Sequence, residues 1–145
     1  MKTVKDVIIK ITGIVFLFSV LTACDKQENE KASKSKTELI SSGNWYFTAY
    51  TETQNGTTTD VFTSMLTCHK DNYYVFRADG SGEFNYGVQK CNGDPQSIPY
   101  IWVFTDNEAK VKLDNGNTYI INELTEDKLE LVLPGTISHT LTFSH

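Results

Sequence analysis

The stretch PYIWVFTDNEAKVKLDNGNTYIINEL, residues 99–124, decides the fold. Its large apolar side chains recur at every second position: Tyr100, Trp102 and Phe104, then Val111 and Leu113, then Tyr119 and Ile121. A period of two is typical of β-strands, whose side chains point alternately to opposite faces. The segments Asp106-Asn107 and Asp114-Asn115-Gly116 separate the three runs, and such residues favour tight hairpins. The stretch therefore predicts three consecutive antiparallel strands.

The same alternation continues on both sides, from about residue 42 to residue 143. The apolar residues expected to share strand faces are Trp45, Phe47 and Ala49; Tyr74 and Phe76; Phe84 and Tyr86; Leu129, Leu131 and Leu133; and Leu141 and Phe143. We predict about eight to nine short antiparallel strands. The link at residues 61–72 is longer and less regular, and residues 61–66 are expected to form at most one helical turn.

A sheet of that many strands removes its two exposed edges by closing on itself, so the predicted fold is an all-β, small up-and-down barrel. An eight-stranded barrel is only just wide enough to be filled by side chains or to hold one small ligand. Two interpretations of the aromatic residues therefore stay open. They fill a packed core, or some of them line a ligand pocket, for which the candidates are Trp45, Phe76, Tyr86, Trp102 and Phe104.

The amino-terminal residues have the composition of an export signal. Lys2, Lys5 and Lys10 accompany an apolar run at residues 11–21, and Leu21-Thr22-Ala23-Cys24 closes that run. The arrangement resembles the signal sequence and lipobox of bacterial lipoproteins. The resemblance implies a signal peptide over residues 1–23 and acyl chains such as palmitate on Cys24. A retained membrane anchor with a coincidental cysteine is the alternative.

A lipidated Cys24 implies a lipoprotein of the cell envelope, attached to a bacterial membrane by acyl chains. The outer membrane is the expected location, and its periplasmic and surface faces both stay open. Residues 24–41 are mostly charged or polar and contain too few apolar side chains to form a core. We predict that they are a flexible tether in front of a single domain at residues 42–145.

Lipidation of Cys24 leaves Cys68 and Cys91 as a pair. In an oxidising compartment outside the cytoplasm such a pair is expected to form a disulfide. A metal site that includes the adjacent His69 is the rival interpretation, but two cysteines 23 positions apart do not have the spacing of a zinc motif. We therefore predict a disulfide and no bound metal.

Several short motifs occur in a characteristic order. They are Gly43-Asn44-Trp45, Cys68-His69-Lys70-Asp71-Asn72, Phe76-Arg77-Ala78-Asp79-Gly80, Cys91, Trp102, Tyr119-Ile120-Ile121 and Leu129-Glu130-Leu131. Together they resemble the lipocalin-like domain family found in many bacterial lipoproteins. The resemblance implies an up-and-down barrel with a disulfide near one end and no established enzymatic role. Arg77, the only arginine, departs from true lipocalins, in which an arginine of a late strand covers the opening tryptophan.

The sequence lacks recognisable catalytic motifs. None of the three histidines, His69, His139 and His145, has a partner at the spacing of a triad, a general base or a metal pair. His69 and His139 are predicted to be ordinary polar surface residues. There is neither a Gly-rich phosphate loop nor a Gly-x-Ser-x-Gly motif. We expect a protein that is not an enzyme and needs no cofactor.

The charge of the predicted domain argues against nucleic acid as a partner. Residues 42–145 contain six basic and thirteen acidic side chains, and phosphate backbones are normally bound by clustered Lys and Arg. Two functions remain. The barrel binds a small apolar or amphipathic ligand, or it is a filled scaffold whose loops at residues 61–72 and 89–99 bind another protein, as an inhibitor, immunity protein or accessory subunit does. An interior pocket above about 300 Å³ favours the first.

Overall fold

The computed structural model describes residues 33–145. The predicted signal peptide (residues 1–23), the predicted lipidation site Cys24 and the tether up to residue 32 lie outside the described residues. The elements are α1 (Lys36–Ile40), β1 (Asn44–Gln54), β2 (Thr57–Asp60), the 3-10 helix η1 (Phe62–Ser64), α2 (Thr67–Lys70), β3 (Tyr73–Phe76), β4 (Ser81–Asn85), β5 (Ser97–Thr105), β6 (Lys110–Leu113), β7 (Thr118–Leu124), β8 (Lys128–Leu133) and β9 (Ser138–Ser144).

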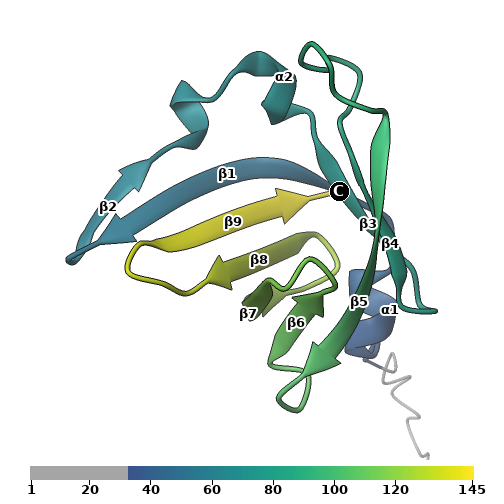
Figure 1. Ribbon diagram of the computed structural model, residues 1–145. Coiled ribbons are helices and arrows are strands. Elements are labelled where there is room, and N and C mark those ends of the chain that lie inside the picture. The colour runs from purple at the N-terminus through teal and green to yellow at the C-terminus, as the bar shows by residue number, and fades with distance from the viewer. Residues whose placement is uncertain (1–32) are drawn as a thin grey trace, which may run out of the picture. The chain divides into compact units, whose positions relative to one another are not determined.

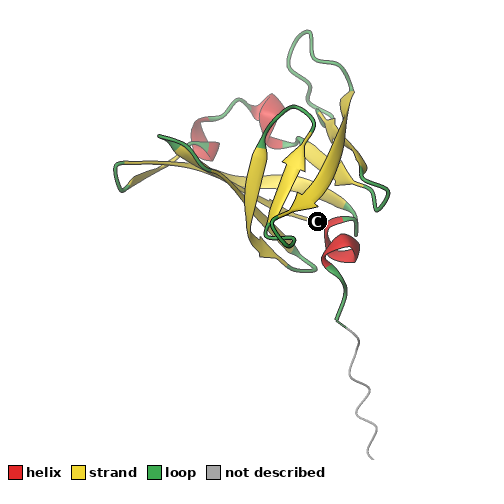
Figure 2. Ribbon diagram, turned by 60° about the horizontal axis from the view of Figure 1, so that its bottom comes forward, coloured by secondary structure: helices red, strands yellow, loops and turns green. Residues whose placement is uncertain are grey.

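The strands form one closed antiparallel barrel, as the alternating pattern predicted (Figures 1 and 2). Sequential strands from β3 to β9 pair as neighbours, and β1 closes the barrel by pairing with β3 on one edge and β9 on the other. The remaining strand, β2, pairs only with the carboxyl-terminal part of β1, between Thr51 and Gln54. Closure leaves β2 as the exposed edge of the described sheet.

Turn residues set the hairpins. Asn55 and Gly56 join β1 to β2 with φ values of 49° and 78°, the left-handed conformation that Asn-Gly turns adopt readily. Asp106, Asn107 and Glu108 also have positive φ, at the turn between β5 and β6. The predicted single turn of helix at residues 61–66 is present as η1 and is followed by α2.

Because the barrel runs up and down, its connections alternate between two ends. We call the end that carries α1, the carboxyl terminus and the turns at residues 77–80, 106–109 and 125–127 the base. The other end, called the mouth, carries the turns at residues 55–56, 114–117 and 134–137 and the longer segments at residues 61–72 and 86–96. Within residues 33–145, no helix is long and apolar enough to cross a bilayer.

The base is closed by α1, which the sequence analysis assigned to the tether. Ile40 is fully buried, and its carbonyl oxygen accepts a 2.7 Å hydrogen bond from Trp45 Nε1. Ser35 and Glu38 form a reciprocal capping box that starts the helix. The tether prediction is therefore wrong for Lys36–Ile40, because one buried isoleucine and a capped helical turn are enough to join this polar segment to the domain.

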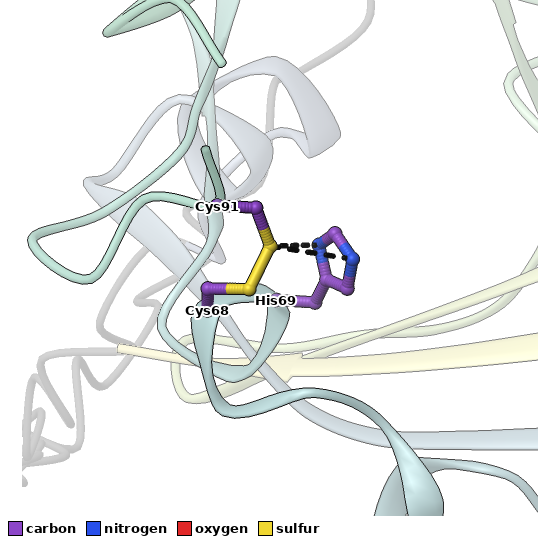
Figure 3. Close-up of side chains that lie close together, drawn as sticks. All are labelled: Cys68, His69 and Cys91. Atoms are coloured by element: carbon purple, nitrogen blue, oxygen red, sulfur yellow. Dashed lines mark hydrogen bonds between the residues drawn. A yellow bond between two sulfur atoms is a disulfide. The ribbon is translucent and has the colours of Figure 1, made fainter. Parts of the chain in front are cut away.

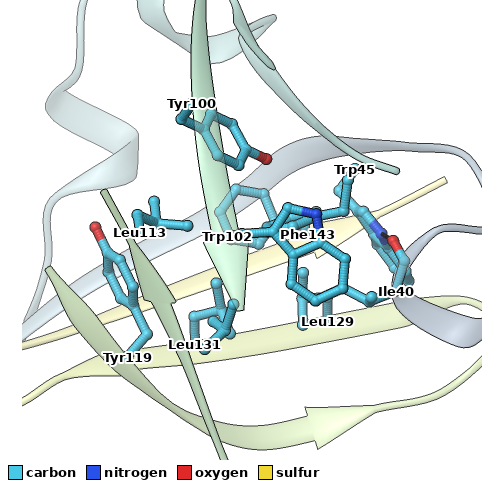
Figure 4. Packing of buried hydrophobic residues seen from close by; sticks show 11 residues of the cluster. Ile40, Trp45, Tyr100, Trp102, Leu113, Tyr119, Leu129, Leu131 and Phe143 are labelled. Carbon is cyan, nitrogen blue, oxygen red and sulfur yellow. Dashed lines mark hydrogen bonds between the residues drawn. The ribbon is translucent and has the colours of Figure 1, made fainter. Parts of the chain in front are cut away.

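Large apolar side chains fill much of the interior (Figure 4). The buried cluster extends from Ile40 at the base to Leu113, next to the turn at residues 114–117. Trp102 is anchored in it by bonds from Nε1 to the carbonyl oxygens of Arg77 and Ser81. The ring of His145 packs against Trp45 at 4.0 Å between centroids, with the two planes tilted by 32°. A histidine from the chain end thus covers the opening tryptophan, and Arg77 instead pairs with Glu83.

One prediction about β1 is wrong. Phe47 pairs with Phe143 of β9, but Ala49 pairs with Thr142 because the register shifts between Phe47 and Ala49. Such a bulge inserts one residue and reverses the facing of every residue after it. Ala49 therefore does not share the face of Trp45 and Phe47.

Candidate functional site

The interior is not completely filled. A partly enclosed cavity of about 170 Å³ lies between the inner faces of β1, β3, β4 and β9 and the segment that contains η1 and α2. Its walls are mostly aromatic and aliphatic, and the lining residues are Phe47, Met65, His69, Asn72, Tyr74, Phe84, Leu141 and Phe143. Concave, mainly apolar sites with few polar groups are typical of small-molecule binding.

The segment at residues 61–72 covers this cavity because β1 has no strand partner over part of one edge. On that edge β2 pairs with β1 from Thr51 onward, and β3 pairs with β1 only up to Tyr46. Two backbone bonds fix the segment across the gap. The amide of Val61 donates to the Tyr50 carbonyl at 2.9 Å, and the amide of Phe47 donates to the Asn72 carbonyl at 3.1 Å.

Aromatic contacts hold the walls of the cavity in place. Phe62 of η1 packs edge-on against Phe47 at 5.6 Å between centroids. Tyr74 lies 4.9 Å from Phe84 and 5.5 Å from Phe143, measured in the same way. Burial raises the pKa of the Tyr74 phenol, because the charged form would lose its hydration. The four rings that line the cavity, Phe47, Tyr74, Phe84 and Phe143, come from four different strands, so the barrel itself shapes the cavity.

A disulfide joins the two long segments of the mouth. Cys68 of α2 and Cys91 of the link at residues 86–96 are bonded, with their Cα atoms 5.2 Å apart, as the sequence analysis predicted. Both ring nitrogens of His69 lie 3.6–3.7 Å from Cys91 Sγ (Figure 3). The ligand atoms of these three residues lie within 4.8 Å of one another. While the sulfurs are bonded to each other they offer no thiolate to a metal.

Two polar residues, His69 and Asn72, line the cavity. Asn72 is 6% exposed, and within residues 33–145 no group donates a hydrogen bond to its Oδ1. Asn85, which is buried to a similar extent, differs: its Oδ1 accepts bonds from Gly87 N and Gln96 Nε2. A buried acceptor without a donor costs about 1–3 kcal/mol. Asn72 is therefore a residue of the cavity wall whose side-chain acceptor has no protein donor among residues 33–145.

None of the five aromatic residues predicted to line a pocket lines this cavity. Trp45, Phe76 and Trp102 are buried in the packed cluster. Phe104 packs on Trp102, and Tyr86 packs edge-on against Phe84, which does line the cavity. Alternation identified which side chains point inward, but it contains no information on where along the barrel the packing leaves space.

A polar cluster lies next to the cavity, and sequence reasoning missed it. Tyr50 Oη is 2.7 Å from Glu52 Oε1 and 2.8 Å from His139 Nδ1. Burial and the bond to Glu52 together raise the pKa of Tyr50 to about 12. His139 was predicted to be an ordinary surface residue, but it lies on the same strand face as Leu141, two positions away, and Leu141 lines the cavity.

The bulge in β1 explains why the cluster forms. After the shift at Phe47 and Ala49, Tyr50 pairs with Leu141 and Glu52 pairs with His139. Directly paired residues of antiparallel strands have their side chains on the same face. Tyr50, Glu52 and His139 therefore face inward at the mouth. No sequence motif marks the bulge.

A second hollow of about 180 Å³ shares Tyr74 and Phe84 with the cavity beneath η1 and α2 and extends past Tyr100 and Leu113 to the turn at residues 114–117. Another, of about 340 Å³, is an open depression over β4 and β5, beside Arg77 and Ile101. The cavity beneath η1 and α2, at about 170 Å³, is smaller than the volume of about 300 Å³ above which an interior pocket favours ligand binding over a filled barrel. This cavity is nevertheless the candidate site, because it is lined by inward-facing side chains of β1, β3, β4 and β9 and by Asn72, whose Oδ1 has no donor among residues 33–145.

Comparison with known protein families gives one match. A family described as a lipocalin-like domain matches residues 42–131, which include β1 to β7 and most of β8. The helix α1 at the base and the closing strand β9 lie outside the matched residues. No curated protein matches the chain.

Proposed function

The chain belongs to the lipocalin-like domain family, and from this premise we propose that its barrel binds a small apolar or amphipathic molecule. The proposed site is the cavity beneath η1 and α2. The observation that supports it most directly is the combination of aromatic walls with one buried acceptor, Asn72 Oδ1, that has no protein donor among residues 33–145. In sites of this kind apolar walls supply affinity, and a few polar groups fix orientation.

The size of the cavity limits the ligand. An apolar cavity of about 150 Å³ in another protein accommodates benzene. The cavity of about 170 Å³ is therefore suited to an aromatic ring or a short branched alkyl group. A larger ligand has to extend past Met65 and the mouth into solvent.

The proposed test uses two ring ligands that differ in one hydrogen-bond donor. Toluene and phenol are titrated into the full chain labelled with ¹⁵N, and amide shifts are followed by NMR. We expect both to perturb the amides around Phe47, Met65 and Tyr74. Phenol is expected to bind about three- to tenfold more tightly, because its hydroxyl donates to Asn72 Oδ1. Shifts confined to the outer face around Ile101, or no shifts at saturation, contradict the proposal.

We also propose that the domain is attached to a bacterial membrane through acyl chains on Cys24. The support is the Leu21-Thr22-Ala23-Cys24 segment after an apolar run. Two acyl chains give lasting attachment where one gives marginal binding. In this proposal the protein is a binding protein of the cell envelope, without catalytic activity or nucleic-acid partner. Mass spectrometry of Cys24 in protein from its own host tests the attachment.

A second function has its own support. Leu66 and Val88 are 66% and 94% exposed, and they lie on the two mouth segments that the disulfide joins. Exposed apolar side chains on a braced loop pair are typical of protein contacts. If the barrel instead acts through these loops, Leu66→Ser with Val88→Ser abolishes capture of the partner and leaves toluene binding unchanged. Loss of toluene binding in that variant contradicts a separate role for the loops.

A further inference from the structure

The cluster of Tyr50, Glu52 and His139 forms one hydrogen-bonded unit. Besides the two bonds of the Tyr50 hydroxyl, His139 Nδ1 lies 3.4 Å from Glu52 Oε1. The rings of Tyr50 and His139 stack at 5.9 Å between centroids. All three side chains are half-buried. Such a unit holds the Glu52 carboxylate in a defined place at the mouth.

The cluster adjoins the cavity. Tyr50 is paired with Leu141 across β1 and β9, and its ring lies 6.2 Å from the ring of Phe47. Both Leu141 and Phe47 line the cavity. His139 follows at the second position from Leu141, and two residues of a strand extend about 7 Å. A short spacer is therefore enough to join a ring in the cavity to a head group at the cluster.

The bonds within the cluster leave acceptors free. The single hydroxyl proton of Tyr50 can serve only one neighbour, and the other contact to its oxygen requires a proton from His139 Nδ1. Among residues 33–145, neither Glu52 Oε2 nor His139 Nε2 has a hydrogen-bond partner, and no Lys or Arg pairs with Glu52. Asn72, whose Oδ1 also has no donor among these residues, lines the adjoining cavity. The site thus offers acceptors and a carboxylate that has no Lys or Arg partner and contacts only His139 among basic groups of residues 33–145.

From this juxtaposition we propose that the ligand is an amphipathic amine, with its apolar group in the cavity and its ammonium group at Glu52. This proposal rests on the proposed function and specifies its ligand class. An ammonium group supplies three donors and a positive charge, which match the free acceptors and the charge of Glu52. An alcohol satisfies only part of that set, and a carboxylate is repelled by Glu52.

Three probes with the same ring and spacer test the proposal: 2-phenylethylamine, 2-phenylethanol and phenylacetate. Each is titrated into the full chain at neutral pH by calorimetry. We expect the amine to bind about tenfold more tightly than the alcohol, because its hydrogen bonds are charge-assisted. Phenylacetate is expected to bind more weakly than the alcohol.

Two variants test whether the preference for the amine over the alcohol depends on the Glu52 carboxylate. Glu52→Gln is expected to remove the preference, so that the variant binds the amine and the alcohol with similar affinity. Glu83→Gln is the matched control, because Glu83 lies on β4 and pairs with Arg77, and it is expected to change none of the three affinities. If the amine and the alcohol bind with equal affinity, or if Glu52→Gln still prefers the amine over the alcohol, the proposal that the ligand is an amine is overturned. The proposed function is not affected by either result. If no probe binds, the proposed function itself is overturned.

Discussion

Asn72 is the residue on which the proposed ligand site depends most. Replacing it with leucine keeps the volume and removes the unpartnered acceptor, so the free energy of unfolding is expected to rise by about 1–2 kcal/mol. The same change should abolish the preference for phenol over toluene. Urea unfolding of the full chain measures the first effect, and the ligand titration measures the second.

The control for that prediction is Asn85→Leu. Asn85 Oδ1 accepts two hydrogen bonds, so its loss is expected to lower the free energy of unfolding by about 1–3 kcal/mol. The two substitutions are thus expected to change the free energy of unfolding in opposite directions. If Asn72→Leu destabilises the protein as much as Asn85→Leu does, Asn72 has a protein partner in solution and the site loses its polar group.

Tyr50 gives a pH-dependent prediction. Burial and the bond to Glu52 raise the pKa of its phenol from the ordinary value of 10.0 to about 12, so the folded state favours the protonated form. Its contribution to stability is complete below pH 10 and is lost as the pH rises through about 12. In a pH titration followed by tyrosinate absorbance, Tyr50→Phe should show one tyrosine fewer that titrates near pH 12 than the unchanged chain does. A missing group that titrates at 10 contradicts burial of Tyr50.

At the scale of elements, α1 shows how a short helix can belong to a domain despite its polar sequence. Ile40 is fully buried against the base, so Ile40→Ala is expected to lower the free energy of unfolding by about 2–4 kcal/mol. Leu39→Ala, at a half-buried neighbouring position, is the control and should have a smaller effect. If both substitutions have equally small effects in urea unfolding, Lys36–Ile40 belongs to the tether and not to the folded domain.

The disulfide braces α2 against the link at residues 86–96. Cys68→Ala with Cys91→Ala is expected to lower the free energy of unfolding by about 3–4 kcal/mol, from the entropy of the opened loop. Amide hydrogen exchange should become faster in residues 61–72 and 86–96 and change less in β5 to β8. Uniform acceleration across the whole barrel would show that the bond does not act locally.

The elements also show what the sequence could and could not predict. Alternation and turn residues predicted the strands, the antiparallel order and the closed barrel, because each inward residue contributes to one continuous core. The bulge at Phe47 and Ala49 was not predictable, because no residue there requires it, and it decides that Tyr50 and Glu52 face inward. The location of the cavity was not predictable either, since it depends on how rings from separate strands fill space.

One missed element did have a signal. Ser35 and Glu38 have the three-residue spacing of a capping box, which marks the start of a helix even within a charged segment. The composition of residues 24–41 outweighed that local pattern. Cys68 and Cys91, by contrast, were paired correctly because few alternatives existed for two cysteines.

At the scale of the whole molecule, the barrel has a closed base and a mouth that contains the remaining space. Residues 33–35 enter the domain at α1, so a chain attached through Cys24 would be tethered at the base. The mouth, with the cavity and the Tyr50 cluster, lies at the opposite end of the strands. This polarity suits a tethered protein that takes up its ligand from the aqueous compartment.

The central claim, that a ligand enters the barrel beneath η1 and α2, is tested most directly by isotope-filtered NMR of the full chain with bound 2-phenylethylamine. The account predicts nuclear Overhauser contacts from the ring protons to Met65, Leu141 and Phe47. Contacts confined to outward-facing residues such as Ile101 and Val103 would contradict it.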